Sequence, residues 1–314
     1  MRNHVPATYG GPEWKSRQLT HVRDVEDGFI WHRCGSSSEV DRLRSVVLAR
    51  PHPGMFGVGD PDDHLLLEWP DPQKLYSQAE SIKHFYETQG INVYWAHIES
   101  GFPNFLFQRD LFFMTPEGAV LARPASLQRS GEARFAAMLL SKLGIPLLAT
   151  PRGKALFEGA DALWLTPKTI LVGVGLRTNL HGADFISGLV RDMGIDCIRV
   201  AVPHGVQHLL GIVNFLDSNL AAVRSDTVTK ELLTVLRDFG IETISCNTGR
   251  EISESLGMNF VTLSPREIVM PSGCPRLCEQ LRSSGVTIHE LEISEYCKAA
   301  GGLACLTGII HRAS

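Results

Sequence analysis

Four polar segments of the chain carry residue types that could catalyse a reaction. Cys305 follows a pair of glycines, and His208 lies in a short polar segment of its own. Carboxylates lie in two further segments, residues 108–110 and 157–161, and both have apolar neighbours. A thiol, an imidazole and two or three carboxylates are the groups needed to bind a planar cation and to attack its central carbon. These residue types therefore indicate chemistry on a guanidinium group.

Asp110 and Glu158 are the candidate ligands of that cation. A guanidinium presents its N–H donors as a planar fork, and a carboxylate binds it through two parallel hydrogen bonds. Phe107 and other apolar neighbours favour buried carboxylates over surface salt bridges. The sequence leaves three alternatives for Asp161: it could bind the cation, orient His208 or cap a turn.

Cys305 is the candidate nucleophile. The thiolate is the reactive form of a cysteine, and a bound cation or a nearby imidazolium lowers the pKa of the thiol. The glycine pair before Cys305 lets the backbone approach a ligand closely. The alternative is a buried structural cysteine, which is our interpretation of Cys197, Cys246 and Cys297.

His208 is the candidate acid and base. It would protonate the departing amine and then activate the water that hydrolyses a covalent intermediate, because one group with a pKa near neutrality can serve both steps. The alternative is a metal site shared with His204. Pro203 and Gly205 disfavour the helix that this spacing would need, so the sequence predicts no metal there.

Two arginines follow apolar segments and could bind a substrate carboxylate. Arg177 lies in residues 175–179, and Arg129 lies in residues 127–132. Arginine pairs with a carboxylate through two hydrogen bonds, which gives geometric specificity as well as affinity. The alternative for either arginine is a solvated surface charge.

The elements that must position these residues repeat along the chain. Five apolar segments with helical spacing each end in a glycine followed by isoleucine or valine, at residues 90, 144, 194, 240 and 285. Glycine is the expected residue after a helix because it accepts the left-handed conformation. Each glycine precedes a short β-rich segment, and strand–turn–strand patterns precede several of the helices. The predicted unit is therefore a hairpin, a helix and a strand, five times from about residue 39 to the end.

Units of this size favour a closed ring. Each is too small to bury its apolar face alone, and a ring of five leaves no open end. A ring would also bring the polar segments at the junctions together at its axis. The alternative is an open α/β sheet, but no glycine-rich phosphate loop follows a strand. We predict an α/β fold with a catalytic domain at residues 39–314 and an N-terminal extension at residues 1–38. The extension would be an arm on the ring or an oligomer contact.

The composition excludes several classes of protein. The chain has 314 residues, a formal net charge of −4 and no basic block, so nucleic acid is not an expected partner. No apolar segment is long enough to span a bilayer and no secretory signal is recognisable, so we expect no membrane contact and a cytoplasmic location. The seven cysteines are scattered, which does not indicate a disulfide framework.

As a set, the motifs resemble those of the guanidino-group-modifying enzymes. This superfamily, also called the penteins, includes arginine deiminase, dimethylarginine dimethylaminohydrolase and the amidinotransferases. The resemblance covers nearly all of residues 39–312 and implies a five-bladed α/β propeller with pseudo-fivefold symmetry. The motifs that carry it are Pro103-Asn104, Gln108-Arg109-Asp110, Phe157-Glu158-Gly159-Ala160-Asp161, Arg177-Thr178-Asn179, His208-Leu209 and Gly301-Gly302-Leu303-Ala304-Cys305.

The resemblance also implies roles for individual positions. The catalytic and guanidinium-binding residues of the superfamily match Cys305, His208, Asp110 and Glu158. Residues that it places near the substrate carboxylate match Arg129, Arg177 and Asn104.

One position departs from the pattern of arginine deiminases and amidinotransferases. They usually carry an aspartate two residues after the histidine, where this chain has Leu210. Dimethylarginine dimethylaminohydrolases also lack that aspartate, and residues 208–222 look most like theirs. An apolar group in place of a carboxylate suits an alkylated guanidine. In contrast, Arg109 and residues 157–161 look more like those of arginine deiminases.

We therefore predict a cysteine-dependent hydrolase of arginine or an Nω-substituted arginine. Cys305 would form a covalent thiouronium intermediate with release of an amine or ammonia, and water would then give a ureido product such as citrulline. The prediction includes no metal and no cofactor, a small guanidine substrate as partner, and compatibility with a homo-oligomer. The alternatives are an amidinotransferase that passes the amidino group to an amine, and a non-catalytic binding protein with the same ring.

Overall fold

Five three-stranded sheets form the body of the computed structural model, which describes residues 5–57, 59–98, 101–247 and 249–313. Their strand orders are β15-β1-β2, β3-β4-β5, β6-β7-β8, β11-β10-β9 and β12-β13-β14. The strands are β1 Arg42–Ala49, β2 Asn92–Ala96, β3 Phe112–Thr115, β4 Gly118–Leu121, β5 Leu147–Ala149, β6 Ala162–Thr166, β7 Thr169–Val174, β8 Asp196–Ala201, β9 Val213–Asp217, β10 Leu220–Arg224, β11 Glu242–Cys246, β12 Val261–Ser264, β13 Glu267–Pro271, β14 Thr287–Leu291 and β15 Gly308–Ala313.

Each sheet combines one antiparallel and one parallel pair of strands. In four sheets a hairpin forms the antiparallel pair, and a helix then leads to a third, parallel strand. In the remaining sheet, β15 from the far end of the chain pairs antiparallel with β1, while β2 pairs parallel with β1. The helices are α1 His21–Asp27, α2 Pro72–Thr88, α3 Ala133–Lys142, α4 Leu180–Arg191, α5 Lys230–Asp238, α6 Arg250–Ser253, α7 Pro275–Ser283, α8 Ser294–Lys298 and α9 Leu303–Leu306.

The predicted glycine signal at the helix ends is confirmed. Helices α2, α3, α4, α5 and α7 each end shortly before one of the five glycines. The φ angles of these glycines are +73° at Gly90, +76° at Gly144, +72° at Gly194, +72° at Gly240 and +78° at Gly285. A residue with a Cβ is strained in this left-handed region, so glycine ends each helix and turns the chain into the next strand.

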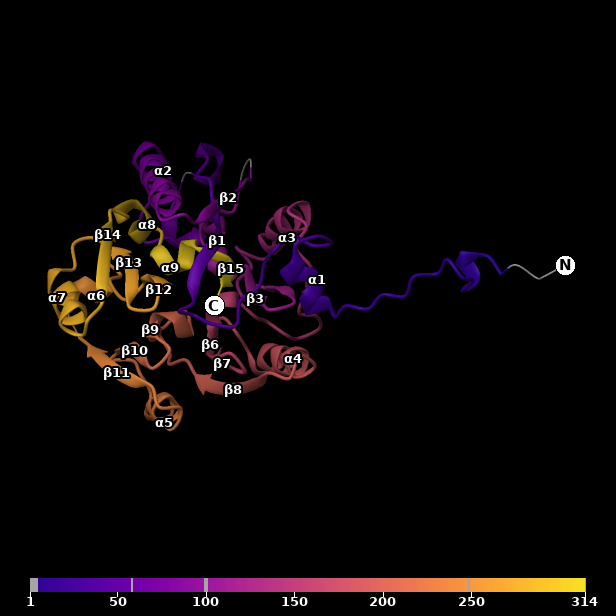
Figure 1. Cartoon of the computed structure of the whole chain (residues 1–314). Coiled ribbons are helices and arrows are strands. Elements are labelled where there is room, and N and C mark those ends of the chain that lie inside the picture. The colour runs from indigo at the N-terminus through magenta and orange to yellow at the C-terminus, as the bar shows by residue number, and fades with distance from the viewer. Residues whose placement is uncertain (1–4, 58, 99–100, 248, 314) are drawn as a thin grey trace.

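The sheets are arranged around a common centre in the order of the sequence (Figure 1). β15 lies against β3, β3 against the turn that leads into β6, and β6 against the turn that leads into β9. β9 then lies against β12, and β12 lies against β1, which closes the circle. Helices α2, α3, α4, α5 and α7 lie on the outside of this circle in Figure 1.

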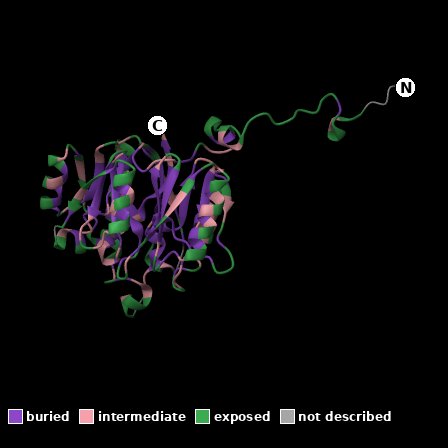
Figure 2. Cartoon of the chain, turned by 90° about the horizontal axis from the view of Figure 1, so that it is seen from below, coloured by how far each residue is buried: buried purple, intermediate pink, exposed green. Residues whose placement is uncertain are grey.

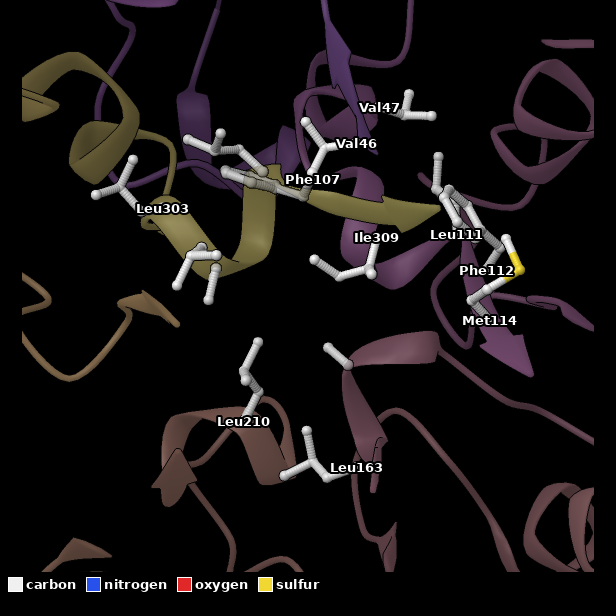
Figure 3. Close-up of a cluster of buried hydrophobic side chains, with 14 of the residues drawn as sticks. Val46, Val47, Phe107, Leu111, Phe112, Met114, Leu163, Leu210, Leu303 and Ile309 are labelled. Carbon is white, nitrogen blue, oxygen red and sulfur yellow. The ribbon is translucent and has the colours of Figure 1, made fainter. Parts of the chain in front are cut away.

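The apolar core fills the centre of the circle. Phe107, Leu163, Leu210 and Ile309 come from different sheets or the turns before them and gather in one cluster (Figure 3). All four are buried. Figure 2 shows that buried residues concentrate on the strands and exposed residues on the outer helices. A polar group inside this core loses its contacts with water, so it must be paired within the protein.

The N-terminal segment approaches the sheets from outside (Figures 1 and 2). The ring nitrogen Nε2 of His21, at the start of α1, lies 2.9 Å from the carbonyl oxygen of Glu117. Gly35 forms an isolated β-bridge with His311 of β15. The predicted domain boundary after residue 38 stays a prediction, and residues 1–4 lie outside the described range. Within the described residues, no helix has both the length and the apolar character needed to cross a bilayer.

Candidate active site

Each of the five sheets has one polar or thiol-bearing side chain shortly before a strand of its antiparallel pair, and two of these five residues are aspartates. Asp110 precedes β3, Asp161 precedes β6, His208 lies at the turn before β9, Asn259 precedes β12 and Cys305 precedes β15. Because these strands face one another around the centre, residues distant in sequence come close together. The chain thus contributes a carboxylate, an imidazole, an amide and a thiol from equivalent positions of successive units.

Asp110, Glu158 and His208 form a buried contact at the centre. His208 Nε2 lies 2.7 Å from Glu158 Oε2, and His208 Nδ1 lies 3.9 Å from Asp110 Oδ1. The second carboxylate oxygen of Glu158 accepts a hydrogen bond from the backbone N–H of Ala125 at 3.1 Å. Among the described residues, Asp110 Oδ1 is buried and accepts no hydrogen bond. This oxygen is therefore available to an N–H donor of a ligand.

The two carboxylates hold His208 in its charged form. Burial lowers the pKa of His208, but the charge of Asp110 and the hydrogen bond to Glu158 outweigh it and raise the pKa to about 9. Burial raises the pKa of Glu158, and the hydrogen bond and charge of His208 outweigh it, so the net pKa is lowered. At neutral pH the pair is an imidazolium and a carboxylate, so His208 carries a proton that it can donate.

Cys305 is half-buried in α9 and is held by Asn259. Asn259 Nδ2 donates to Cys305 Sγ at 3.0 Å, and the backbone N–H of Cys305 donates to Asn259 Oδ1 at 3.0 Å. Burial and the charge of Asp110 raise the pKa of the Cys305 thiol to about 11, whereas the hydrogen bond from Asn259 lowers it. The thiol is therefore protonated at neutral pH until a further positive charge arrives.

Arg129 is fully buried beside the same carboxylates. Its Nη1 donates to Asp110 Oδ2 at 2.6 Å and lies 3.6 Å from Glu158 Oε2. Its Nε donates to Glu132 Oε2 at 2.9 Å, and its Nη2 donates to the backbone carbonyl of Asn104 at 3.2 Å. Burial raises the pKa of Glu132 to about 7, opposed by the charge of Arg129. The protein thus places one of its own guanidinium groups against the predicted cation-binding carboxylates.

The remaining predicted residues surround this centre in supporting positions. Asp161 Oδ1 accepts a hydrogen bond at 2.9 Å from the backbone N–H of Leu209, next to His208. This contact fits the orienting role that the sequence left open for Asp161. Arg177 Nη1 lies 3.5 Å from Glu158 Oε2, and Asn104 Nδ2 donates to the carbonyl of His64 at 2.6 Å.

Two residues of the centre were missed in the sequence. Asn259 and Glu132 are not among the predicted site residues. The repeat contains a signal for Asn259, since the other four units each carry a predicted site residue shortly before the corresponding strand. No comparable signal marks Glu132, because its partner Arg129 was expected to face a ligand.

Comparisons with known proteins point to the chemistry that these groups suggest. A family model described as arginine deiminase matches residues 96–239. The N(G),N(G)-dimethylarginine dimethylaminohydrolase of Pseudomonas aeruginosa is 24% identical over 238 residues, which are 76% of this chain and 89% of that relative. The chain is therefore similar in sequence to guanidino-group-modifying enzymes.

Solved structures of guanidino-modifying enzymes share the fold of this chain. A cysteine-to-serine mutant of the Pseudomonas aeruginosa dimethylarginine dimethylaminohydrolase, in complex with citrulline, matches with a TM-score of 0.69 and 21% identity over 85% of this chain and 99% of that one. The amidinotransferase SxtG of Microseira wollei, from saxitoxin biosynthesis, matches with a TM-score of 0.77 and 16% identity over 90% of this chain and 98% of that one.

Leu210, the position that differs from the pattern of arginine deiminases and amidinotransferases, is buried in this structure. It stands where they have an aspartate, is 3% exposed and belongs to the apolar cluster of Figure 3. It also lines a small internal cavity together with Arg109 and Arg312. The proposed effect of Leu210 on an alkylated guanidine stays a prediction, and the burial of its side chain gives it a packing role.

Three residues of the centre could also approach a metal ion. Asp110, Glu158 and His208 offer ligand atoms within 4.8 Å of one another. Arg129 Nη1 already lies beside both carboxylates, so a divalent cation would have to compete with a fixed guanidinium. The absence of a metal requirement stays a prediction.

Proposed function

We propose that the chain is a cysteine-dependent hydrolase of a guanidino compound. The observation that carries the proposal is the convergence of Asp110, Glu158 and His208 with α9, the helix of Cys305, at the centre of the five sheets. The relatives support hydrolysis, since both the matched family model and the Pseudomonas aeruginosa relative carry names of guanidine-modifying hydrolases. Arginine and Nω-methylated arginines are the proposed substrates.

The substrate guanidinium binds against the carboxylates. Asp110 Oδ1 and Glu158 accept its N–H groups, and the positive charge of the substrate offsets the effect of Asp110 on the thiol. Its arrival therefore lowers the pKa of Cys305, and the thiol releases its proton to solvent, so that substrate binding itself activates the nucleophile. Arg177 has further N–H donors besides the one at 3.5 Å from Glu158 Oε2, and we propose that they bind the substrate carboxylate.

The reaction then proceeds in two steps. The thiolate of Cys305 adds to the guanidinium carbon, and the C–N bond to the departing amine breaks as the imidazolium of His208 donates its proton to that nitrogen. The neutral imidazole next accepts a proton from water, which adds to the carbon of the thiouronium intermediate. The C–S bond then breaks, the hydroxyl proton of the adduct passes to the departing thiolate of Cys305, and the ureido product leaves. Cys305 is again a thiol and His208 again an imidazolium.

The same proposal extends to the architecture of the protein. We propose that the five sheets are the blades of an α/β propeller with pseudo-fivefold symmetry, because the same kind of residue position recurs before β3, β6, β9, β12 and β15. The cytoplasmic location and a homo-oligomeric state remain proposals with it.

A product assay tests the function. The purified chain is incubated with arginine, Nω-methylarginine, asymmetric dimethylarginine, agmatine or guanidinoacetate, with and without glycine as acceptor, and products are identified by mass spectrometry. We expect a ureido product with ammonia or an alkylamine. A guanidinylated glycine would instead identify an amidinotransferase, which the fold of SxtG makes the second candidate.

Variants test the assigned nucleophile. Cys305→Ser is expected to bind substrate with little turnover, because a hydroxyl is a much weaker nucleophile than a thiolate. Cys297→Ser is the matched control, since Cys297 is a free, half-buried cysteine in α8, before the glycine pair. Full activity of Cys305→Ser would refute the mechanism, and absence of turnover with every guanidine would favour the non-catalytic alternative.

A further inference from the structure

A second buried charged cluster lies close to the active centre. Arg109, Arg312 and Glu39 are 7%, 7% and 8% exposed, respectively. Arg109 precedes Asp110 in the sequence, Arg312 belongs to β15, and Glu39 lies shortly before β1. The cluster therefore joins the turn before β3 to the sheet that contains β15 and β1.

The charges within this cluster do not cancel. Arg109 Nη2 donates to both carboxylate oxygens of Glu39, at 3.0 and 3.1 Å, and the backbone N–H of Trp164 donates to the same carboxylate at 3.1 Å. Arg312 Nη1 donates to a neutral acceptor, the backbone carbonyl of Asp41, at 2.6 Å. Among the buried groups, two guanidinium groups thus share one carboxylate, which leaves one buried positive charge in excess. The half-buried Asp41 acts on Arg312 through its charge and forms no ion pair with it among the described residues.

Two donors of the cluster are unused. Among the described residues, neither Arg109 Nε nor Arg312 Nε has a hydrogen-bond partner, although both atoms are buried. Both side chains line the same two small cavities, with volumes of about 20 Å³ and about 10 Å³. The larger cavity is also lined by Glu39 and by three neutral polar residues, Asn214, Thr262 and Thr307. A volume of about 10–15 Å³ accommodates one particle the size of water.

We propose that this cavity binds one small monovalent anion of the size of chloride. A water molecule would accept the N–H donors but would leave the buried positive charge uncompensated, whereas an anion satisfies both requirements. Oxyanions such as sulfate or phosphate are too large for about 20 Å³. Burial and the charge of Arg109 lower the pKa of Arg312 to about 10, so it still carries its charge at neutral pH.

The surface offers a route for such an ion to enter. Two larger cavities of about 250 Å³ each lie next to the cluster, and one of them is lined by Ser36 and Arg312, the other by Ser38 and Glu39. The smallest cavity shares lining residues with both of them. The bound anion would link the turn before β3 with β15, and so would stabilise the closed arrangement of the sheets.

Anion-dependent unfolding tests the site. The melting temperature of the full chain is measured in sodium chloride and in sodium gluconate at equal ionic strength, since gluconate is too large for the cavity. We expect a melting temperature higher by a few degrees in chloride, because an ion that binds only the folded state stabilises it. Diffraction from crystals grown with bromide, recorded at the bromine absorption edge, should show an anomalous peak near Arg109 Nε and Arg312 Nε.

A variant and its control assign the effect to the cluster. Arg312→Gln removes the excess charge and is expected to abolish the chloride-specific shift, whereas Arg282→Gln, a half-exposed arginine paired with Glu290, should retain it. Persistence of the shift in Arg312→Gln would overturn the proposal. Equal melting temperatures in the two salts without a bromide peak would also overturn it, and would mean that water alone fills the cavity. If Arg312→Gln does not fold, the bromide peak of the unsubstituted chain decides.

Discussion

The hydrogen bond from Asn259 to Cys305 leads to a quantitative prediction about thiol reactivity. Asn259→Ala removes the donor at 3.0 Å from Sγ and leaves the thiol buried beside Asp110. A hydrogen bond to a charged group contributes about 1.5–3 kcal/mol. Since one pKa unit corresponds to about 1.4 kcal/mol, the substitution should raise the pKa of Cys305 by about one to two units above its value of about 11.

The expected change in rate is smaller than the change in thiolate population. The thiolate fraction well below the pKa falls by about tenfold to a hundredfold for one to two units. A more basic thiolate is intrinsically more nucleophilic, with a Brønsted slope of about 0.4–0.5. On a logarithmic scale this gain in nucleophilicity offsets roughly half of the rate that is lost through the smaller thiolate fraction. Alkylation of Cys305 by iodoacetamide should therefore slow by roughly threefold to tenfold at about pH 8.

Peptide-level mass spectrometry measures this rate separately for each of the seven cysteines. Asn179→Ala is the matched control, because Asn179 is a half-buried asparagine that caps α4 and donates to the carbonyl of Lys154, with no hydrogen bond to Cys305 or Asn259 among the described residues. Asn259→Asp keeps the acceptor for the Cys305 N–H but places a negative charge near the thiol, so it should slow alkylation further. Equal or faster alkylation of Cys305 in Asn259→Ala would refute the reasoning.

Four further outcomes are expected. The raised pKa of His208 contributes stability that is fully present below pH 6.5, the ordinary pKa of histidine, and is lost as pH rises through about 9. The unfolding free energy of the wild type should therefore exceed that of His208→Gln by less and less over this pH range, as measured by urea titration. Arg129→Met leaves buried carboxylates without their partner and should cost about 3–5 kcal/mol in the same measurement; a loss under about 1 kcal/mol would contradict the buried network. Asp161→Ala should cost about 1–3 kcal/mol and Asp161→Asn much less, because the amide oxygen still accepts from Leu209. Turnover should survive excess chelator, and recovery of a lost activity by an added divalent metal would contradict the metal-free prediction.

Most of the fold could be predicted from local signals in the sequence. The five helix-ending glycines follow from backbone sterics at single residues, and the strands follow from short β-rich segments next to them. The pairing of β15 with β1 could not be predicted in the same way, because it joins segments whose partner is set by closure of the whole arrangement and by no local residue.

The candidate site was predicted less completely than the fold. Residue type and apolar surroundings were enough to choose Asp110, Glu158, His208 and Cys305, since burying a polar group costs free energy unless that group is paired or binds a ligand. The contacts of Arg129 were not predictable, because its sequence neighbours do not show whether its guanidinium faces a ligand or the carboxylates of its own chain. Side-chain direction at a loop depends on packing from other sheets, which no local pattern encodes.

The pairing of β15 with β1 links the position of the proposed nucleophile to the closure of the ring of sheets. β15 follows Cys305 directly and pairs with residues at the opposite end of the folded region, such as Arg42 with Ala313. A contact of such long range forms only after the chain has lost much of its loop entropy, so the thiol reaches its place late in folding. Detachment of this one strand would disperse the catalytic groups while the other four sheets keep their pairing. Loss of the proposed activity is thus expected at lower denaturant concentration than loss of secondary structure, so that turnover would report partial unfolding.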